Sequence, residues 1–217
     1  MKVGTDGVLL GAWTDVKQAK RILDIGTGTG LLALMLAQRS NAEIDAIEID
    51  SEAAEQACEN INHSPWSHRI RIIHTSFQEF AGIKKKYDLI VSNPPYFINS
   101  LKTPDKKRSL ARHDHELNHK SLTEGVKILL AGKGRFDVVL PADNFRLFCE
   151  SMNNNGLYVS RQTNIYSNPE SSCIRVLAEF SHTNSIKNSN DIVIETGGRH
   201  QYSTQYSELV KEYFLNY

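Results

Sequence analysis

The feature that most constrains the fold of this chain is a glycine-rich turn, Asp24-Ile-Gly26-Thr-Gly28-Thr-Gly30, between an apolar run and a helical pattern. The run Arg21–Ile25 is typical of a buried strand, and Leu31–Gln38 is typical of a helix. Glycines let the backbone turn sharply and let a ligand approach it closely, and the following helix presents its free N–H groups there. The turn therefore predicts a strand–turn–helix unit with a small-molecule site at its end, against the alternative of a tight turn without a ligand.

Strand-like and helical segments alternate along most of the chain. The strand-like runs are 43–49, 69–74, Tyr87–Ser92 and 135–140, and the helical ones are Ser51–Asn62, 119–130 and 143–152. Two β-rich runs then follow, 157–166 and 173–182, with no helical pattern between them. Such a pattern predicts an α/β fold with a mostly parallel sheet, an antiparallel strand near its end and helices on both faces. We expect a single domain over residues 1–217 and a loop over 183–190.

The ligand predicted at this turn is a nucleoside without a diphosphate. The dinucleotide fingerprint needs a glycine where this chain has Leu31, and Asp24 would repel a pyrophosphate but could meet a ligand ammonium. Glu48 ends the next strand about 20 residues further on, where a carboxylate binds ribose hydroxyls in such folds. The alternative for Glu48 is a solvated charge at a strand end. An S-adenosyl group fits both carboxylates, with Asp24 at its methionine end and Glu48 at its ribose.

A second motif, Asn93-Pro94-Pro95-Tyr96, directly follows the strand Tyr87–Ser92. Its two prolines lack N–H donors and hold a rigid backbone at the carboxyl end of the strand, where open α/β sheets place their sites. The Asn93 amide oxygen and the Pro94 carbonyl can accept the two hydrogens of a planar amino group while the Tyr96 ring stacks on the group that carries it. The motif therefore predicts a site that turns an amino nitrogen toward an electrophile, against the alternative of a proline-stiffened turn.

These motifs together resemble the class I S-adenosylmethionine-dependent methyltransferases that methylate amino groups. DIGTGTG, the acidic AIEID and VSNPPY occur in the family's order over residues 21–96. Residues 1–13, 108–113 (RSLARH) and 201–215 are similar to bacterial tRNA adenine-N6 methyltransferases that act on a valine tRNA, and the resemblance is weakest over 142–200. It implies a Rossmann-like, seven-stranded sheet and S-adenosylmethionine as cofactor. Relatives carry more residues ahead of the 1–13 motif, so we expect a trimmed or incomplete N-terminus.

The resemblance also implies roles for individual residues. Catalysis is expected of Asn93, Pro94, Pro95 and Tyr96. Cofactor contacts are expected of Thr5, Asp6, Asp24, Gly26, Thr27, Gly28, Glu48, Ile49, Ser76, Phe77 and Asn93, with residues 1–20 closing over the cofactor. The family usually has an Asp against the adenine amine at the position of Ser76 and Phe77, so adenine recognition here must rest on backbone groups or stacking.

The implied reaction is an in-line displacement on an adenosine extruded from an RNA loop. Asn93 and Pro94 would hold the exocyclic N6 as it attacks the sulfonium methyl, and adenine 37 of the valine tRNA is the implied target. Three alternatives remain. The motif also serves enzymes that methylate a glutamine amide of release factors and enzymes that methylate guanine N2 of ribosomal RNA. A non-catalytic RNA-binding assembly factor with a retained cofactor pocket is the third.

A formal net charge of zero hides a segregated distribution. Residues 41–60 contain seven acidic side chains and no Lys or Arg, whereas residues 100–112 contain five basic side chains and one acidic one. The loop 98–117 directly follows the Asn93 motif, so we expect it to border the substrate entrance and contact RNA phosphates. The residues expected to contact RNA are Lys102, Lys106, Lys107, Arg108, Arg112 and His113. The alternative is a solvated charged surface.

No metal site is predicted, because His113, His115 and His119 are joined by no cysteine and their spacing alone does not make a closed site. The chain has no apolar run of the roughly 18 residues that a membrane helix needs, and its first residues lack a signal-peptide layout. Three widely spaced cysteines argue against a disulfide framework. We therefore expect a cytoplasmic protein that binds no membrane. The resemblance implies tRNA as its partner, and we expect a monomer.

Overall fold

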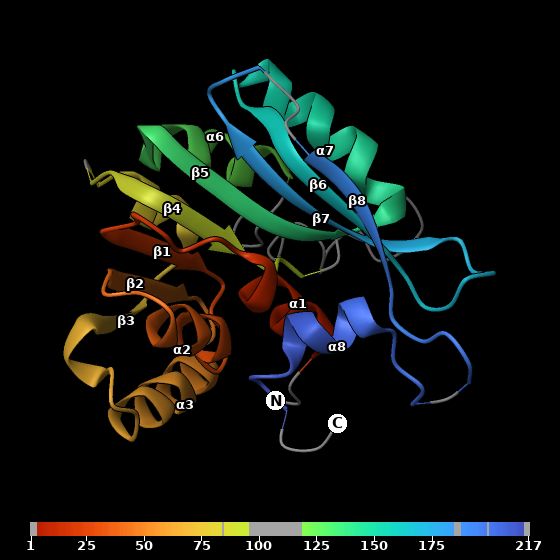
Figure 1. Ribbon diagram of the computed structural model, residues 1–217. Helices are drawn as coiled ribbons and strands as arrows, with labels where there is room; N and C mark the ends of the chain where they lie inside the picture. Colours follow the sequence, from red (N-terminus) through yellow and green to blue (C-terminus); the bar gives the residue numbers. More distant parts are fainter. Residues whose placement is uncertain (1–3, 84, 96–118, 185–187, 199, 215–217) are drawn as a thin grey trace, which may run out of the picture.

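The computed structural model describes residues 4–83, 85–95, 119–184, 188–198 and 200–214. In these residues eight strands form one sheet in the order β3-β2-β1-β4-β5-β7-β6-β8 (Figure 1). The strands are β1 (Arg21–Ile25), β2 (Glu43–Glu48), β3 (Ile70–His74), β4 (Tyr87–Ser92), β5 (Leu130–Pro141), β6 (Tyr158–Tyr166), β7 (Cys173–Ser181) and β8 (Asn188–Val193). Only β7 runs antiparallel to its neighbours, β5 and β6. The prediction of a mostly parallel sheet with an antiparallel strand near its end is confirmed.

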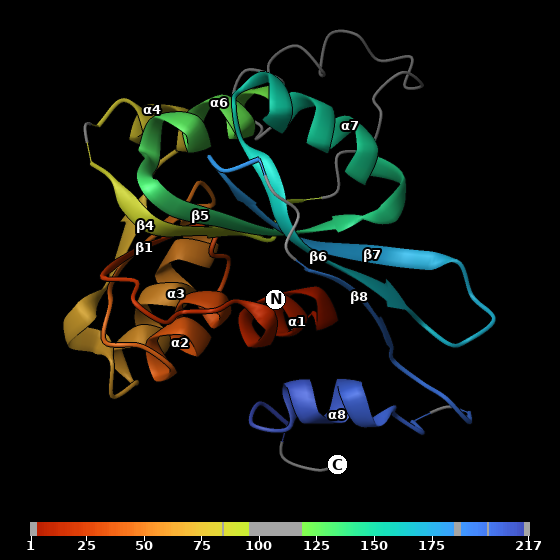
Figure 2. The ribbon, with the colours of Figure 1, turned by 45° about the horizontal axis from the view of Figure 1, so that its top comes forward.

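The helices cover both faces of the sheet, as predicted (Figure 2). They are α1 (Thr5–Trp13), α2 (Leu31–Gln38), α3 (Ser51–Asn62), α4 (Phe77–Ala81), α6 (His119–Leu129), α7 (Ala142–Asn154) and α8 (Thr204–Val210), with a 3-10 turn at Ser67–Arg69. The side chains of β1 alternate between two cores: Ile22 packs in the core that includes α1 and α2, and Leu23 packs in the core that includes α6 and α7. Asp24 therefore lies on the α2 side of the sheet, as the two-residue period of a strand requires.

The described residues form eight strands, whereas seven were predicted. Residues 188–190, which were predicted to belong to a loop, begin the eighth strand. This strand pairs in parallel with β6 at the edge of the sheet. Its first residues are polar, but their side chains bond to the neighbouring strand: Thr163 Oγ1 donates to Asn190 Oδ1, and Asn164 Nδ2 donates to Asp191 Oδ1 at 2.8 Å. Polar residues are common on edge strands, which must not attract further strands. A hydrophobic pattern could not reveal this strand.

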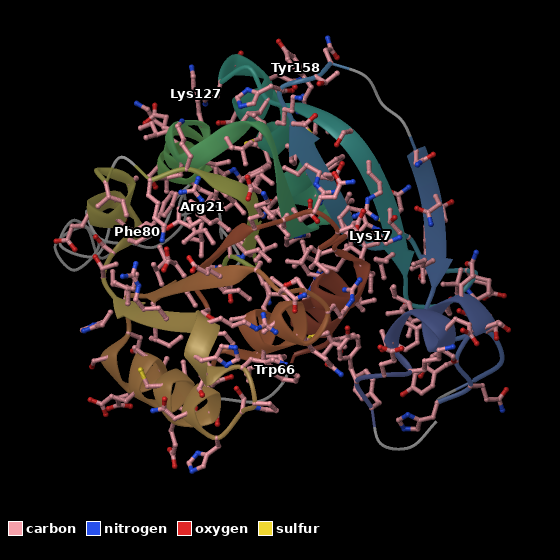
Figure 3. All side chains as sticks on the ribbon, turned by 60° about the vertical axis from the view of Figure 1, so that its left-hand side comes forward. Lys17, Arg21, Trp66, Phe80, Lys127 and Tyr158 are labelled. Carbon is pink, nitrogen blue, oxygen red and sulfur yellow. The ribbon has the colours of Figure 1, made fainter. Side chains whose placement is uncertain are left out.

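Helix α1 was also not predicted, because it lacks the polar face that makes a helix visible in sequence. Its residues from Gly7 to Trp13 are all buried, in contact with α2, β5 and α8. Trp13 ends the helix, and its Nε1 donates to Thr163 Oγ1 at 2.8 Å while the Arg161 guanidinium stacks on its ring. Trp66, labelled in Figure 3, packs at the rim of the same core. Both tryptophans are packing residues.

The topology brings the predicted motifs to one edge of the sheet. Strands β1, β2 and β4 are mutually parallel neighbours, so their carboxyl ends meet at this edge. Because β7 is antiparallel, its amino end reaches the same edge. In the part of the chain that the structure describes, no helix has the length and apolar character that crossing a membrane requires.

Candidate active site

The glycine-rich turn after β1 is held in a conformation that glycine favours. Gly26, Gly28 and Gly30 have positive φ angles of 70°, 57° and 83°. The Gly26 and Thr27 N–H groups both donate to the Ile47 carbonyl at 3.0 Å, which ties the turn to the end of β2. A Cβ on Gly26 would meet no atom within 4 Å, so the turn leaves open space above it. The turn thus exposes backbone next to the carboxyl end of β1.

Asp24 is a buried carboxylate directly beneath this turn. It is 1% exposed, and its Oδ2 accepts a hydrogen bond from Thr27 Oγ1 at 2.6 Å, whereas its Oδ1 has no hydrogen-bond partner in the described residues. The pKa of Asp24 is raised to about 7, mainly by burial and to a smaller extent by the Glu48 charge, whereas hydrogen bonds from Thr27 and from the Ala33 backbone lower it. A buried carboxylate oxygen without a partner destabilises the native state. At Asp24 this oxygen lies beside an open glycine turn, and the two features together are typical of a site that a ligand completes.

Glu48 links the turn to the end of β2. Its Oε2 accepts from the Gly28 N–H at 2.8 Å, and its Oε1 accepts from the N–H groups of Ile49 and Asp50 at 2.9 and 3.0 Å. A carboxylate has about four acceptor positions, so these three bonds orient the group without saturating it. The adjacent Ile49 side chain is 50% exposed. An oriented carboxylate beside an exposed apolar side chain suits a ribose that carries a flat base.

Ser76 is the N-cap of α4 and Phe77 is its first residue, and both side chains are buried. The Ser76 hydroxyl accepts from the Glu79 N–H at 3.2 Å and forms a capping box with Glu79. Phe77 is 5% exposed and belongs to the core, where it fills the space beside Gly125 of α6. The Phe77 ring is therefore not exposed for an adenine to stack on. Recognition of the adenine by backbone groups or by stacking on another side chain stays a prediction.

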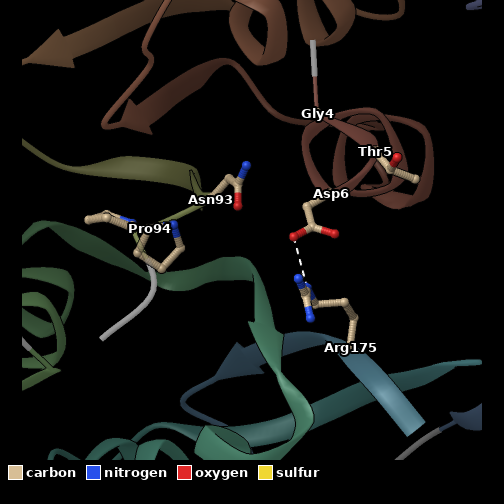
Figure 4. Close-up of a pocket in the computed structure, with 7 residues that line it drawn as sticks. Gly4, Thr5, Asp6, Asn93, Pro94 and Arg175 are labelled. Carbon is tan, nitrogen blue, oxygen red and sulfur yellow. Dashed lines mark hydrogen bonds and ion pairs between the residues drawn. The ribbon is translucent and has the colours of Figure 1, made fainter. Parts of the chain in front are cut away.

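Asn93, Pro94 and Pro95 follow β4 and line a cavity of about 390 Å³ with Gly4, Thr5, Asp6 and Arg175 (Figure 4). The Ser92 hydroxyl donates to the Ile25 carbonyl at 2.9 Å, which fixes the end of β4 to the end of β1. Pro94 is buried, whereas Asn93 and Pro95 are exposed. The structure thus brings the predicted residues Thr5, Asp6, Asn93, Pro94 and Pro95 to one cavity, although the first two are far from the others in sequence.

Sequence reasoning missed Arg175, the only cation among the described residues that line this cavity. It lies near the start of β7, and its Nε donates to Asp6 Oδ2 at 2.8 Å, across the cavity from Asn93 (Figure 4). No motif surrounds Arg175 in the sequence, and the family resemblance is weakest there. Only the antiparallel course of β7 could have indicated its position.

Several predicted residues lie outside the residues that the structure describes. They are Tyr96, Lys102, Lys106, Lys107, Arg108, Arg112 and His113, so their placement remains a prediction. His119 is described, and its ring packs edge-on against Phe148 with 5.3 Å between ring centres. In the described residues no group of three or more His, Cys, Asp or Glu side chains is placed to hold a metal ion.

Comparisons with known proteins agree with this geometry. Residues 4–121 match the methyltransferase small domain family. The chain is 48% identical to the tRNA1(Val) (adenine(37)-N6)-methyltransferase of Bacteroides fragilis strain YCH46, over 99% of this chain and 91% of that protein. It is 42% identical to the protein of the same name from Trichodesmium erythraeum, over 100% and 92% of the two chains.

Solved structures show the same fold at low sequence identity. A predicted O-methyltransferase from Agrobacterium tumefaciens superposes with a TM-score of 0.70 at 18% identity, over 95% of this chain and 96% of that one. The glycopeptide N-methyltransferase MtfA, solved with S-adenosylmethionine, superposes with a TM-score of 0.60 at 14% identity, over 84% and 100% of the chains. The match to the family model shows that this chain belongs to the methyltransferase small domain family. The relatives that align over nearly its full length show that, within this family, it belongs to the tRNA1(Val) (adenine(37)-N6)-methyltransferases.

Proposed function

We propose that this protein transfers the methyl group of S-adenosylmethionine to the exocyclic N6 of an adenosine in tRNA, adenine 37 of a valine tRNA. The observation that carries the proposal is the Asn93–Pro94 turn, which opens on a cavity at the carboxyl edge of the sheet, in a chain 48% identical to a relative of that name. We further propose that the chain is one methyltransferase domain over residues 1–217, with residues 1–20 closing over the cofactor and 183–217 as a C-terminal extension. The protein would act as a cytoplasmic monomer.

The residues present fit S-adenosylmethionine. Asp24 has a buried oxygen without a partner in the described residues, which suits an ammonium group or a water bound to it. The open space above Gly26 lets a ligand approach the backbone, and Glu48 is oriented by Gly28, Ile49 and Asp50 toward the same turn. When bound, S-adenosylmethionine supplies an electrophilic methyl group on a sulfonium. We propose that Asp24 and the turn hold its methionine end and that Glu48 holds its ribose.

Asn93 and Pro94 would orient the acceptor nitrogen. Proline has no N–H group, so the backbone at Pro94 and Pro95 presents acceptors to the cavity and no competing donor. The Asn93 amide oxygen and the Pro94 carbonyl would accept the two N6 hydrogens, which turns the nitrogen lone pair out of conjugation with the ring. Positioning supplies most of the acceleration in this arrangement. A strong base is not required, because the extra proton on the methylated nitrogen is acidic enough to pass to water.

The proposed function is tested by incubating the protein with labelled S-adenosylmethionine and unmodified bulk tRNA. We expect label in valine tRNA, and digestion of that tRNA should yield N6-methyladenosine at position 37. Release factor and ribosomal RNA serve as competing acceptors in parallel reactions. Label in either of these and not in tRNA, or cofactor binding without transfer to any acceptor, would contradict the proposal.

We propose that the loop 98–117 contacts RNA phosphates through its basic side chains. Neutralising Lys106, Lys107 and Arg108 together should reduce the slope of log affinity against log salt by about 2 to 3, because each phosphate contact releases close to one counterion. The affinity for tRNA is measured by filter binding or anisotropy between about 50 and 200 mM salt. A slope that the triple substitution leaves unchanged would assign RNA binding to another surface.

A further inference from the structure

The cavity beside Asn93 is lined by a cation, Arg175, and an anion, Asp6, which are far apart in the sequence. Arg175 of β7 donates from Nε to Asp6 Oδ2 at 2.8 Å, and its Nη1 donates to the Ile174 carbonyl at 2.9 Å. Asp6 lies in the first turn of α1, where the positive end of the helix dipole favours a carboxylate. The side chains of Arg175 and Asp6 are 25% and 18% exposed. The pair is therefore partly desolvated but still reachable from the cavity.

An ion pair at this position contributes little to stability by itself. Removing two charges from water costs several kcal/mol, and the attraction between them roughly offsets that cost. A guanidinium, however, presents a planar fork of N–H donors that matches a carboxylate or a phosphate equally well. The Asp6 carboxylate thus occupies a place on Arg175 that a phosphate group of a ligand could take.

The position of Arg175 favours a phosphate of the RNA over the carboxylate of the cofactor. Arg175 shares its cavity with Asn93, Pro94 and Pro95, which the proposed function assigns to the target base. Asp24 and Glu48, which are proposed to hold the cofactor, do not line this cavity, whereas Thr5 and Asp6, which are also expected at the cofactor, line it at the end of α1. An extruded nucleotide carries its phosphates one sugar away from its base, so a base held at Asn93 brings a phosphate into the same neighbourhood.

We propose that Arg175 binds a phosphate that flanks the target adenosine, and that this phosphate displaces the Asp6 carboxylate from the guanidinium. The inference rests on the proposed function for the nature of the acceptor. Arg175 is then a substrate-binding residue, and Asp6 holds the guanidinium in position until the RNA arrives.

The test compares tRNA binding by the wild type and four variants: Arg175→Ala, Arg175→Lys, Asp6→Asn and, as a control, Arg71→Ala. Arg71 also pairs with an aspartate, Asp45, but it lies on β3 away from the cavity, and Asp45 keeps Lys85 and Tyr87 as partners. Arg175→Ala should weaken tRNA binding by about tenfold and reduce the salt slope by about one. Arg175→Lys should weaken binding less and leave the slope unchanged. Arg71→Ala should change neither the affinity for tRNA nor the salt slope.

Asp6→Asn separates a phosphate site from a structural ion pair. It removes the competing carboxylate, so tRNA should bind as tightly as to the wild type or more tightly. Equal weakening of tRNA binding by Asp6→Asn and Arg175→Ala would overturn the inference, as would an unchanged affinity of Arg175→Ala. A loss of S-adenosylmethionine affinity without a loss of tRNA affinity would assign Arg175 to the cofactor instead. If Arg175→Ala does not fold, Arg175→Gln replaces it.

Failure of the inference and failure of the proposed function give different results. Methyl transfer by the wild type to valine tRNA is measured in the same series. A wild type that methylates tRNA while Arg175→Ala binds tRNA normally overturns only the role of Arg175. A wild type that transfers nothing to tRNA overturns the proposed function.

Discussion

Replacing Asn93 with alanine is expected to lower kcat for methyl transfer by about 10²–10³-fold, the usual cost of removing one preorganised hydrogen-bonding group at a reacting atom. The variant loses the amide oxygen that would accept an N6 hydrogen, so the nitrogen lone pair is no longer held toward the methyl group. The fold should survive, because Asn93 is exposed and the end of β4 stays fixed to β1 through Ser92. Single-turnover methylation of valine tRNA gives the rate, and calorimetric titration gives the affinity for S-adenosylmethionine.

Asn93→Asp is the matched variant for this experiment. It has nearly the same size and keeps an acceptor oxygen, so it should retain more activity than Asn93→Ala if accepting a hydrogen bond is what matters. The affinity for S-adenosylmethionine should stay within about threefold of the wild type in both, because Asn93 is one of many expected cofactor contacts and those of the turn and Glu48 remain. Activity of Asn93→Ala near that of the wild type would remove Asn93 from the proposed mechanism.

Replacing Asp24 with asparagine is expected to stabilise the protein without ligand and to abolish cofactor binding. Burial raises the pKa of Asp24 from 3.8 to about 7, so an ionised Asp24 at neutral pH opposes folding by up to about 4 kcal/mol. Asparagine removes that charge and keeps an acceptor for Thr27. We expect the melting temperature of the free protein to rise by several degrees and the affinity for S-adenosylmethionine to fall by 100-fold or more, because the ligand ammonium loses its counter-charge.

The pH dependence of stability and of cofactor affinity should have opposite signs. Between about pH 4 and pH 7 the folded protein holds a proton on Asp24 that the unfolded chain releases. The stability from this proton is fully present below the unfolded pKa of 3.8 and is lost as the pH rises through the folded pKa of about 7. Cofactor affinity should instead rise through the same range, since only the ionised carboxylate attracts an ammonium. Denaturant unfolding and calorimetric titration between pH 5 and about pH 8 measure both.

Asp137→Asn is the control for this prediction. Asp137 lies in β5, is fully buried, and has a pKa raised to about 7 by burial and by the neighbouring Glu179, against Arg161 and Arg135. It does not line the cavity beside Asn93. Its substitution should therefore flatten the loss of stability with rising pH without changing cofactor affinity. If Asp24→Asn left cofactor affinity unchanged as well, Asp24 would have no role in the site.

Sequence patterns predicted elements with one polar face and also short apolar runs of strand length that are buried on both faces. The strand Tyr87–Ser92 and the helix Ser51–Asn62 were predicted with the bounds that the structure shows. The patterns did not predict α1 or β8. Helix α1 is buried on nearly all sides, and β8 begins with exposed polar residues at the sheet edge, so neither has the hydrophobic period of its class.

The sequence by itself determined which chemical groups lie at the ends of the strands. Asp24, Glu48 and Asn93 each stand at the end of an apolar run, and parallel strands bring such ends to one edge of a sheet. The local sequence pattern is sufficient to place these residues at strand ends, because each strand and the turn that follows it are continuous in the chain.

Only the tertiary structure decided which residues complete the cavity and which are excluded from it. Phe77 was expected at the cofactor but turns into the core, because α4 packs it against Gly125 of α6. Arg175 had no expected role but lines the same cavity as Asn93, because the antiparallel course of β7 returns the chain to the carboxyl edge of the sheet. Asp6 and Arg175 are 169 residues apart in sequence. Contacts over such separations depend on how the strands are ordered and directed, which no local pattern encodes.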